Sequence, residues 1–219
     1  MGLIDFFLSR WQDILELTLE HLLLVLVAMA ISIVLGVTIG ILITRSRALA
    51  NLVLGLASIM MTIPSLALFS LLLPILGIGT APAIVGLVAY TQLPIIRNVY
   101  VGITTIDPAI IEAARGMGLT ERKILLRIQI PLAIPASMIG IRTAVVMGIG
   151  IGAIASYIGA GGLGTYIFQG ISRTNDNMVI IGAILISLIA ILADKYLGQL
   201  QNRLVQAKPK TEGGKHDRI

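Results

Sequence analysis

Two long runs without a single charged residue dominate this sequence. The first covers 22 residues, 22–43, and the second covers 49 residues, 48–96. A helix needs about 20 apolar residues to cross a hydrocarbon core of about 30 Å, so the second run is too long for one crossing. Only 12% of all residues are charged and 57% are hydrophobic. Soluble domains carry about 25% charged residues, so the chain is predicted to be a membrane protein with little room for a soluble domain.

Turn-forming residues divide the apolar sequence into five predicted spans. Pro74 and the stretch 77–82 break the long second run, and a glycine-rich stretch at 159–164 ends the fourth span. The fold class is therefore an all-α, multi-pass membrane protein with one transmembrane domain over residues 1–199. A disordered cytoplasmic tail is expected over 200–219. The spans are predicted at about 20–44, 52–76, 81–101, 133–158 and 177–197.

The basic residues indicate how the chain is oriented. The formal net charge is +5, but the Lys and Arg residues flank the apolar runs, as they do at the cytoplasmic ends of spans. With the loop between the third and fourth spans inside, 14 of the 16 basic residues lie inside, and only Arg10 and Arg173 lie outside. We therefore expect an outside N-terminus, a cytoplasmic C-terminus and no nucleic-acid partner. The first apolar run is longer than a signal-peptide core, so we expect it to be retained.

The loop between the third and fourth spans contains the signals for two short helices. The Asp107–Pro108 pair can start the first helix, because Asp caps free N–H groups and Pro fits the first turn. Gly116 and Gly118 can end it, because glycine adopts positive φ without penalty. Thr120 can cap the second helix and Pro131 is expected to stop it. The prediction is a sharp corner between two helices.

The second of these helices is amphipathic. Ile124, Leu125 and Ile128 form one apolar stripe, while Arg122 and Lys123 fall largely elsewhere. A rigid corner of this kind suits the transfer of movement between two bodies, because packed interfaces move as units. An ordinary amphipathic loop lying on the bilayer is the alternative.

The same segment resembles the EAA loop of the membrane subunits of bacterial ABC importers. The resemblance lies in Glu112-Ala113-Ala114, in Gly118 four residues after the second Ala, and in the Ile-x-apolar-Pro ending at Pro131, where Ile130 replaces a frequent Leu. It implies a cytoplasmic loop over about 103–131 that couples to an ATPase. The residues expected to make this coupling contact are Glu112, Ala113, Ala114, Arg115, Gly116, Met117, Gly118, Leu119, Thr120, Arg122 and Lys123.

The resemblance also implies partners and excludes some chemistry. We expect membrane lipid, a second permease that is identical or homologous, two copies of a cytosolic ABC ATPase, and an extracytoplasmic solute-binding protein. ATP and Mg²⁺ would be bound by the ATPase, because this chain has no Walker motif, no metal-ligand spacing and no Cys. The chain itself is thus expected to be a transport subunit of a bacterial cell membrane and not an enzyme, with no cofactor or metal of its own.

Further motifs indicate the subfamily. Together with five spans, the segments 62–65, 92–98 and 157–164 resemble the permeases of osmoprotectant importers, which have the type I ABC importer permease fold. The resemblance implies quaternary ammonium solutes such as glycine betaine, carnitine and choline. Permeases for an amino acid such as methionine share this size and layout and remain an alternative. An ion-coupled secondary transporter usually needs carboxylates within its spans, and none occurs between Glu20 and Asp107.

Several polar or kinked positions are candidates for the translocation path. Proline within a span bends the helix, so Pro64 and Pro94 are either parts of a gate or packing kinks. Gln92 is expected to form a hydrogen bond between helices. Aromatic residues, which quaternary ammonium recognition favours, make up only 5% of the chain, so we expect selectivity to reside in the binding protein. The full set of candidates is Pro64, Ser65, Tyr90, Gln92, Pro94, Ser156 and Tyr157.

Three further features concern packing. Gly148, Gly150 and Gly152 alternate in the fourth span, where small residues allow helices to approach closely. Arg142 is expected to extend to the cytosolic surface. His21 is expected to lie at the outer membrane boundary.

Overall fold

Helices form all the regular structure of residues 2–206, the part of the chain that the computed structural model describes. The predicted all-α fold class is thus confirmed for this range. Short 3₁₀ turns lie at Ile43–Arg45 and Ser156–Ile158, and a π-helical turn lies at Leu125–Gln129. The α-helices are α1 (Leu3–Ser9), α2 (Trp11–Leu42), α3 (Arg47–Thr62), α4 (Ser65–Leu76), α5 (Thr80–Thr104), α6 (Pro108–Gly116), α7 (Glu121–Ile124), α8 (Ile130–Ala155), α9 (Gly164–Ser172) and α10 (Asp176–Gln206).

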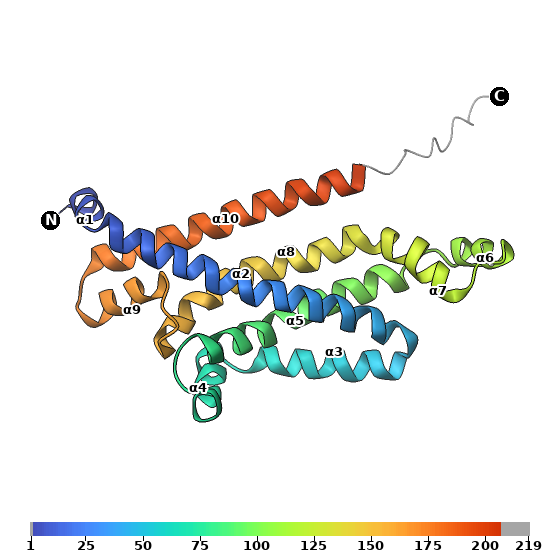
Figure 1. The fold of residues 1–219 in the computed structure, drawn as a ribbon, viewed down its shortest axis with the longest axis horizontal. Helices are drawn as coiled ribbons and strands as arrows, with labels where there is room; N and C mark the ends of the chain where they lie inside the picture. The colour runs from blue at the N-terminus through green and yellow to red at the C-terminus, as the bar shows by residue number, and fades with distance from the viewer. Residues whose placement is uncertain (1, 207–219) are drawn as a thin grey trace.

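The long helices lie roughly along one axis, with the connecting helices at the two ends of the bundle (Figure 1). Helices α2, α5 and α8 share a buried apolar cluster that also includes a residue of α10. Helices α6 and α7 lie at one end of the bundle, together with the connection from α2 to α3. Helices α1, α4 and α9 lie at the other end. The loop that contains α6 and α7 is therefore far from the N-terminus.

Glycines allow the three central helices to cross closely. A Cβ atom on Gly36 of α2 would lie 2.7 Å from Ile95 Cγ2 of α5. On the other side of α5, a Cβ atom on Gly140 of α8 would collide with the Pro94 carbonyl oxygen and lie 2.7 Å from Asn98 Cβ. These close approaches bring backbones together and fix α5 between α2 and α8.

Within residues 2–206, four helices are long and apolar enough to cross a membrane, and the pair α3 and α4 counts as a fifth span if it is taken as one. The axes of these two helices differ by 99°. Pro64 lies in the break, where its fixed φ and missing N–H weaken a continuous helix. The predicted span at 52–76 is therefore a bent pair of helices, and the bend lies at Pro64, where a kink was expected. The first crossing also differs from its prediction, because α2 begins at Trp11 and not near residue 20.

The last helix also extends beyond its predicted end. Helix α10 continues to Gln206, so the predicted tail boundary at residue 200 falls within a helix. The remainder of the predicted disordered tail, from residue 207, lies outside the described residues.

His21, which is expected near the outer membrane boundary, packs inside the protein. Its side chain is fully buried, and Nε2 lies 3.1 Å from the Ile149 carbonyl oxygen of α8. The turn that precedes α9 covers it, because Gly162 packs directly against the His21 backbone and ring. The sequence does not show that this turn folds back onto α2.

Candidate coupling site in the loop between α5 and α8

We refer to residues 105–129, which connect α5 to α8, as the helical loop. Its first helix, α6, begins as predicted. The Asp107 carboxylate accepts a hydrogen bond of 2.9 Å from the Ala109 N–H, and Pro108 occupies the first turn. The helix presents a small residue, Ala114, to the interior, where it is almost fully buried. Its neighbours Glu112 and Ala113 are exposed.

The turn after α6 closes the corner through backbone hydrogen bonds. The Gly118 N–H donates to the Arg115 carbonyl at 2.9 Å, and the Leu119 N–H donates to the Ala114 carbonyl at 3.2 Å. This pair of bonds is the Schellman motif, which requires a left-handed residue at its centre. Gly118 has φ +78° and is that residue, so the predicted helix end at Gly116–Gly118 is confirmed.

The second half of the loop departs from its prediction at both ends. Thr120 precedes α7, but its side chain forms no capping hydrogen bond. Pro131 does not stop the helix: α7 passes through the π-helical turn Leu125–Gln129 directly into α8. The extra residue in a π turn changes the carbonyl register, so a proline there avoids the clash that it causes in a regular α-helix. The predicted apolar stripe is confirmed, with Ile124 buried and Leu125 and Ile128 half-buried.

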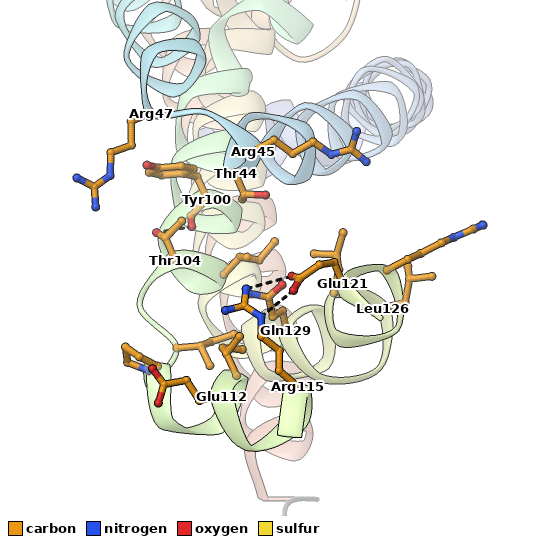
Figure 2. Close-up of a pocket in the computed structure, with 16 residues that line it drawn as sticks. Thr44, Arg45, Arg47, Tyr100, Thr104, Glu112, Arg115, Glu121, Leu126 and Gln129 are labelled. Atoms are coloured by element: carbon orange, nitrogen blue, oxygen red, sulfur yellow. Dashed lines mark hydrogen bonds and ion pairs between the residues drawn. The ribbon is translucent and has the colours of Figure 1, made fainter. Parts of the chain in front are cut away.

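An ion pair connects the two arms of the corner (Figure 2). Arg115 Nε donates to Glu121 Oε1 at 2.7 Å, and Nη2 donates to Oε2 at 3.3 Å. This two-point geometry matches the planar guanidinium to the carboxylate. The hydrogen bond raises the pKa of Arg115 and lowers the pKa of Glu121, and the Coulombic attraction acts in the same direction. Glu121 was not among the predicted coupling residues, because pairing across a turn has no regular spacing.

The helical loop encloses one side of a cavity of about 1090 Å³. Figure 2 shows Tyr100 and Thr104 of α5 facing it from one side and the paired Arg115 and Glu121 from the other. Thr44, at the end of α2, completes the wall. The helical loop thus projects from the bundle and does not pack flat against it.

The predicted coupling residues therefore form one continuous, mostly exposed surface. Met117 at the tip of the corner has 72% of its surface exposed, and Arg122 and Lys123 on α7 are also exposed. Ala114 is the buried exception, and Leu119 is half-buried. An exposed apolar tip next to basic residues can enter a groove in another protein.

The seven path candidates fall into three groups, at the α3–α4 break, in α5 and before α9, and no hydrogen bond or ring contact joins one group to another in the described structure. Pro64 and Ser65 lie at the α3–α4 break, whereas Tyr90 is buried within α5. Gln92 Nε2 donates a 3.4 Å hydrogen bond to the Ser32 carbonyl of α2, as expected for a bond between helices. Pro94 lies within α5, where the Asn98 side chain bonds its carbonyl.

The remaining two path candidates lie near the turn before α9. The Ser156 hydroxyl donates to the Ala153 carbonyl at 2.8 Å, which is a local contact. Tyr157 is 62% exposed, and its ring centre lies 5.3 Å from that of Phe168. No group of three His, Asp or Glu side chains gathers as metal ligands would within residues 2–206.

One ion pair within the spans was missed by the sequence analysis. Arg142 of α8 pairs with Asp194 of α10 through two hydrogen bonds, of which Nη2 to Oδ2 measures 2.6 Å. The guanidinium lies against the backbone at Gly198, where a Cβ atom would come within 3.1 Å of it. Arg142 therefore connects two helices and does not simply extend to the surface. The two residues are 52 positions apart, so only tertiary structure reveals the pair.

A comparison with known families identifies the chain. The sequence pattern of the family described as "Binding-protein-dependent transport system inner membrane component" matches residues 32–206. The chain belongs to this family. It is thus a permease, the membrane subunit of a binding-protein-dependent importer, as the sequence had predicted.

Relatives of this permease are similar over nearly its whole length. The carnitine transport permease protein OpuCB of Listeria monocytogenes is 39% identical over 97% of this chain and 99% of its own length. The osmoprotectant import permease protein OsmW of Salmonella typhimurium is 44% identical over 92% of this chain and 96% of its own. The choline transport system permease protein OpuBB of Bacillus subtilis is 36% identical over 94% of each chain.

The fold of this permease is also found among solved structures. A chain of the MetNI methionine ABC transporter in an inward-facing conformation superposes with a TM-score of 0.81, covering 90% of this permease and 98% of that chain. The sequence identity is 23%, so the match concerns the fold. It confirms the predicted type I ABC importer permease fold.

Proposed function

We propose that this permease moves quaternary ammonium osmoprotectants, such as glycine betaine, carnitine and choline, into a bacterial cell. The relatives that support this proposal are named for these solutes and align over nearly the full chain. An extracytoplasmic binding protein delivers the solute, and two copies of a cytosolic ATPase bind ATP and Mg²⁺ and supply the energy. A second permease, identical or homologous, completes the path.

The helical loop is the proposed docking element for the ATPase. Its closed corner supports this role, because a Schellman turn and a two-point ion pair hold α6 and α7 in one arrangement. A rigid helical loop transmits a displacement of its tip to α5 and α8, whereas a flexible loop would absorb the displacement. The coupling contact is formed by residues 112–120 with Arg122 and Lys123, and the path candidates near Pro64 and Pro94 lie along the route of the solute.

The proposed topology follows from the same assignment. With the helical loop in the cytosol, the N-terminus and α9 lie outside the cell, because they occupy the opposite end of the bundle (Figure 1). The C-terminus then lies in the cytoplasm. The Lys and Arg distribution of the sequence supports this orientation.

A pair of glycine substitutions tests the coupling role. Both Gly116 and Gly118 have open space where a Cβ would lie, but only Gly118 has a positive φ, of +78°. Valine at position 118 must leave that conformation, since a β-branched residue resists positive φ. In the reconstituted importer, we expect Gly118→Val to abolish solute-stimulated ATP hydrolysis. Gly116→Val adds a side chain to the contact but leaves the turn intact, so it should lose less of this activity. Normal coupled transport by a well-expressed Gly118→Val protein would refute the docking proposal.

A further inference from the structure

A second cavity lies at the end of the bundle opposite the helical loop. Its volume is about 460 Å³, within the range of about 300–1,000 Å³ that is common for small-molecule sites. The turn at 159–161, which precedes α9, forms one wall. The other walls come from the N-terminal half of α2 and the start of α5 and are apolar except at two positions. They consist of Glu20, Leu23, Leu24, Val27, Thr80 and Ile84.

The Glu20 carboxylate is held in place at this cavity. Its Oε2 accepts a 2.9 Å hydrogen bond from the Gly162 N–H. Gly161 and Gly162 both have positive φ, and a Cβ atom on Gly161 would lie 2.6 Å from the same oxygen. The Glu20 carboxylate can therefore approach the backbone of this turn only because residues 161 and 162 are glycines. The adjacent His21 is buried and bonds the Ile149 carbonyl, which fixes this part of α2 against α8.

The negative charge of Glu20 has no counter-charge among the described residues. None of the ion pairs in residues 2–206 includes Glu20, and its bond to Gly162 is its one hydrogen bond there. A fixed carboxylate beside apolar side chains suits a cation that is itself apolar at its surface. A quaternary ammonium group has this character, because methyl or methylene groups surround its charge and it has no N–H to satisfy.

The geometry points to this cavity as an outer reception site for the quaternary ammonium group of the solute, with Glu20 as its counter-charge. This inference rests on the proposed function and on the outer location of the α9 end. The four aliphatic side chains contact the methyl groups, and the Thr80 hydroxyl lies within the same cavity for a polar substituent. No aromatic residue lines the cavity, so binding is weak and release is fast.

Protection of a single cysteine tests this site directly. The chain has no native Cys, and Thr80 is an exposed residue of the cavity wall. Thr80→Cys is placed in the full importer in proteoliposomes and reacted with an uncharged maleimide, while choline is titrated at constant ionic strength. Because bound ligand slows modification by the factor 1 + [L]/Kd, we expect about tenfold slowing at roughly ten times Kd.

Two variants and one analogue separate charge from shape. Glu20→Gln keeps an oxygen acceptor for the Gly162 N–H but removes the charge, so choline should no longer protect. Glu16→Gln removes an equally exposed carboxylate one helical turn earlier, outside the cavity, and should leave protection unchanged. The tert-butyl analogue of choline, in which carbon replaces nitrogen, should not protect at the same concentrations.

Several results would overturn the site. These are no protection by choline, equal protection by the uncharged analogue, or full protection in Glu20→Gln. The wild-type importer is assayed in parallel for ATP-dependent uptake of choline and glycine betaine. Uptake without protection would refute the reception site alone, whereas the absence of uptake of every quaternary ammonium solute would refute the proposed function as well.

Discussion

The crossing of α5 and α8 at Gly140 offers a quantitative test of the packing. A Cβ atom there would collide with the Pro94 carbonyl oxygen and lie 3.1 Å from Asn98 Nδ2. The Asn98 side chain donates a 2.8 Å hydrogen bond to the same carbonyl. The substitution Gly140→Ala must therefore separate the helices or displace Asn98 and break this bond. Either change destabilises the permease.

The expected size follows from three contributions. Replacing Gly by Ala in a helix gains about 1 kcal/mol, overpacking costs about 1–3 kcal/mol, and loss of a hydrogen bond costs about 1 kcal/mol. The free energy of unfolding should thus fall by about 1–3 kcal/mol. Gly150→Ala in the same helix is the matched control, because its Cβ would meet no atom within 4 Å. It should leave stability unchanged or raise it by up to about 1 kcal/mol.

The assay is equilibrium unfolding of the purified permease by SDS in mixed micelles, followed by circular dichroism. We predict a lower midpoint for Gly140→Ala than for wild type and a midpoint for Gly150→Ala at or above wild type. If Gly140→Ala proved as stable as Gly150→Ala, α5 and α8 would not cross as closely as described.

Two further predictions concern the helical loop and the topology. Arg115→Glu should impair solute-stimulated ATP hydrolysis. The double variant Arg115→Glu with Glu121→Arg should restore much of this activity, since the pair is exposed and the swap retains its charges. Failure of the double variant to restore activity would show that the ion pair does not hold α6 and α7 together. Arg115 lowers the pKa of Glu121. The ion pair therefore stabilises the folded loop fully at a pH above the ordinary carboxyl pKa, and this stabilisation is lost as the pH falls through the lowered pKa. An impermeant thiol reagent applied outside intact cells should modify Thr80→Cys and Asn175→Cys but not Thr120→Cys, and the reverse pattern would refute the orientation.

Local sequence signals predicted much of the helical loop. Asp107 and Pro108 start α6, and Gly118 ends it, because capping and left-handed turns depend on residues a few positions apart. The π turn before Pro131 was missed, since its dihedral angles are helical and no residue type marks it. Hydropathy indicated the apolar helices, and a bend at Pro64 was expected, but its size of 99° was not. A proline permits a bend without fixing its angle.

The partners in long-range contacts could not be predicted from the sequence. The Arg142–Asp194 pair, the His21 contact with Ile149 and the Glu20 contact with Gly162 each connect residues far apart in the chain. Each contact depends on which helix faces pack together. A helix that is apolar on nearly all sides does not indicate which neighbour packs against which face. Such polar contacts are few within a membrane, so their positions show where the helices of the bundle are held together.

ATP-dependent uptake by the complete importer tests the proposed function most directly. The permease is assembled with its ATPase, binding protein and any second permease in proteoliposomes, and labelled glycine betaine, carnitine, choline and methionine are supplied in turn. We predict ATP-dependent accumulation of at least one quaternary ammonium solute and no accumulation of methionine. Uptake of methionine alone would contradict the proposed solute class, and uptake driven by an ion gradient without ATP would contradict the importer mechanism itself.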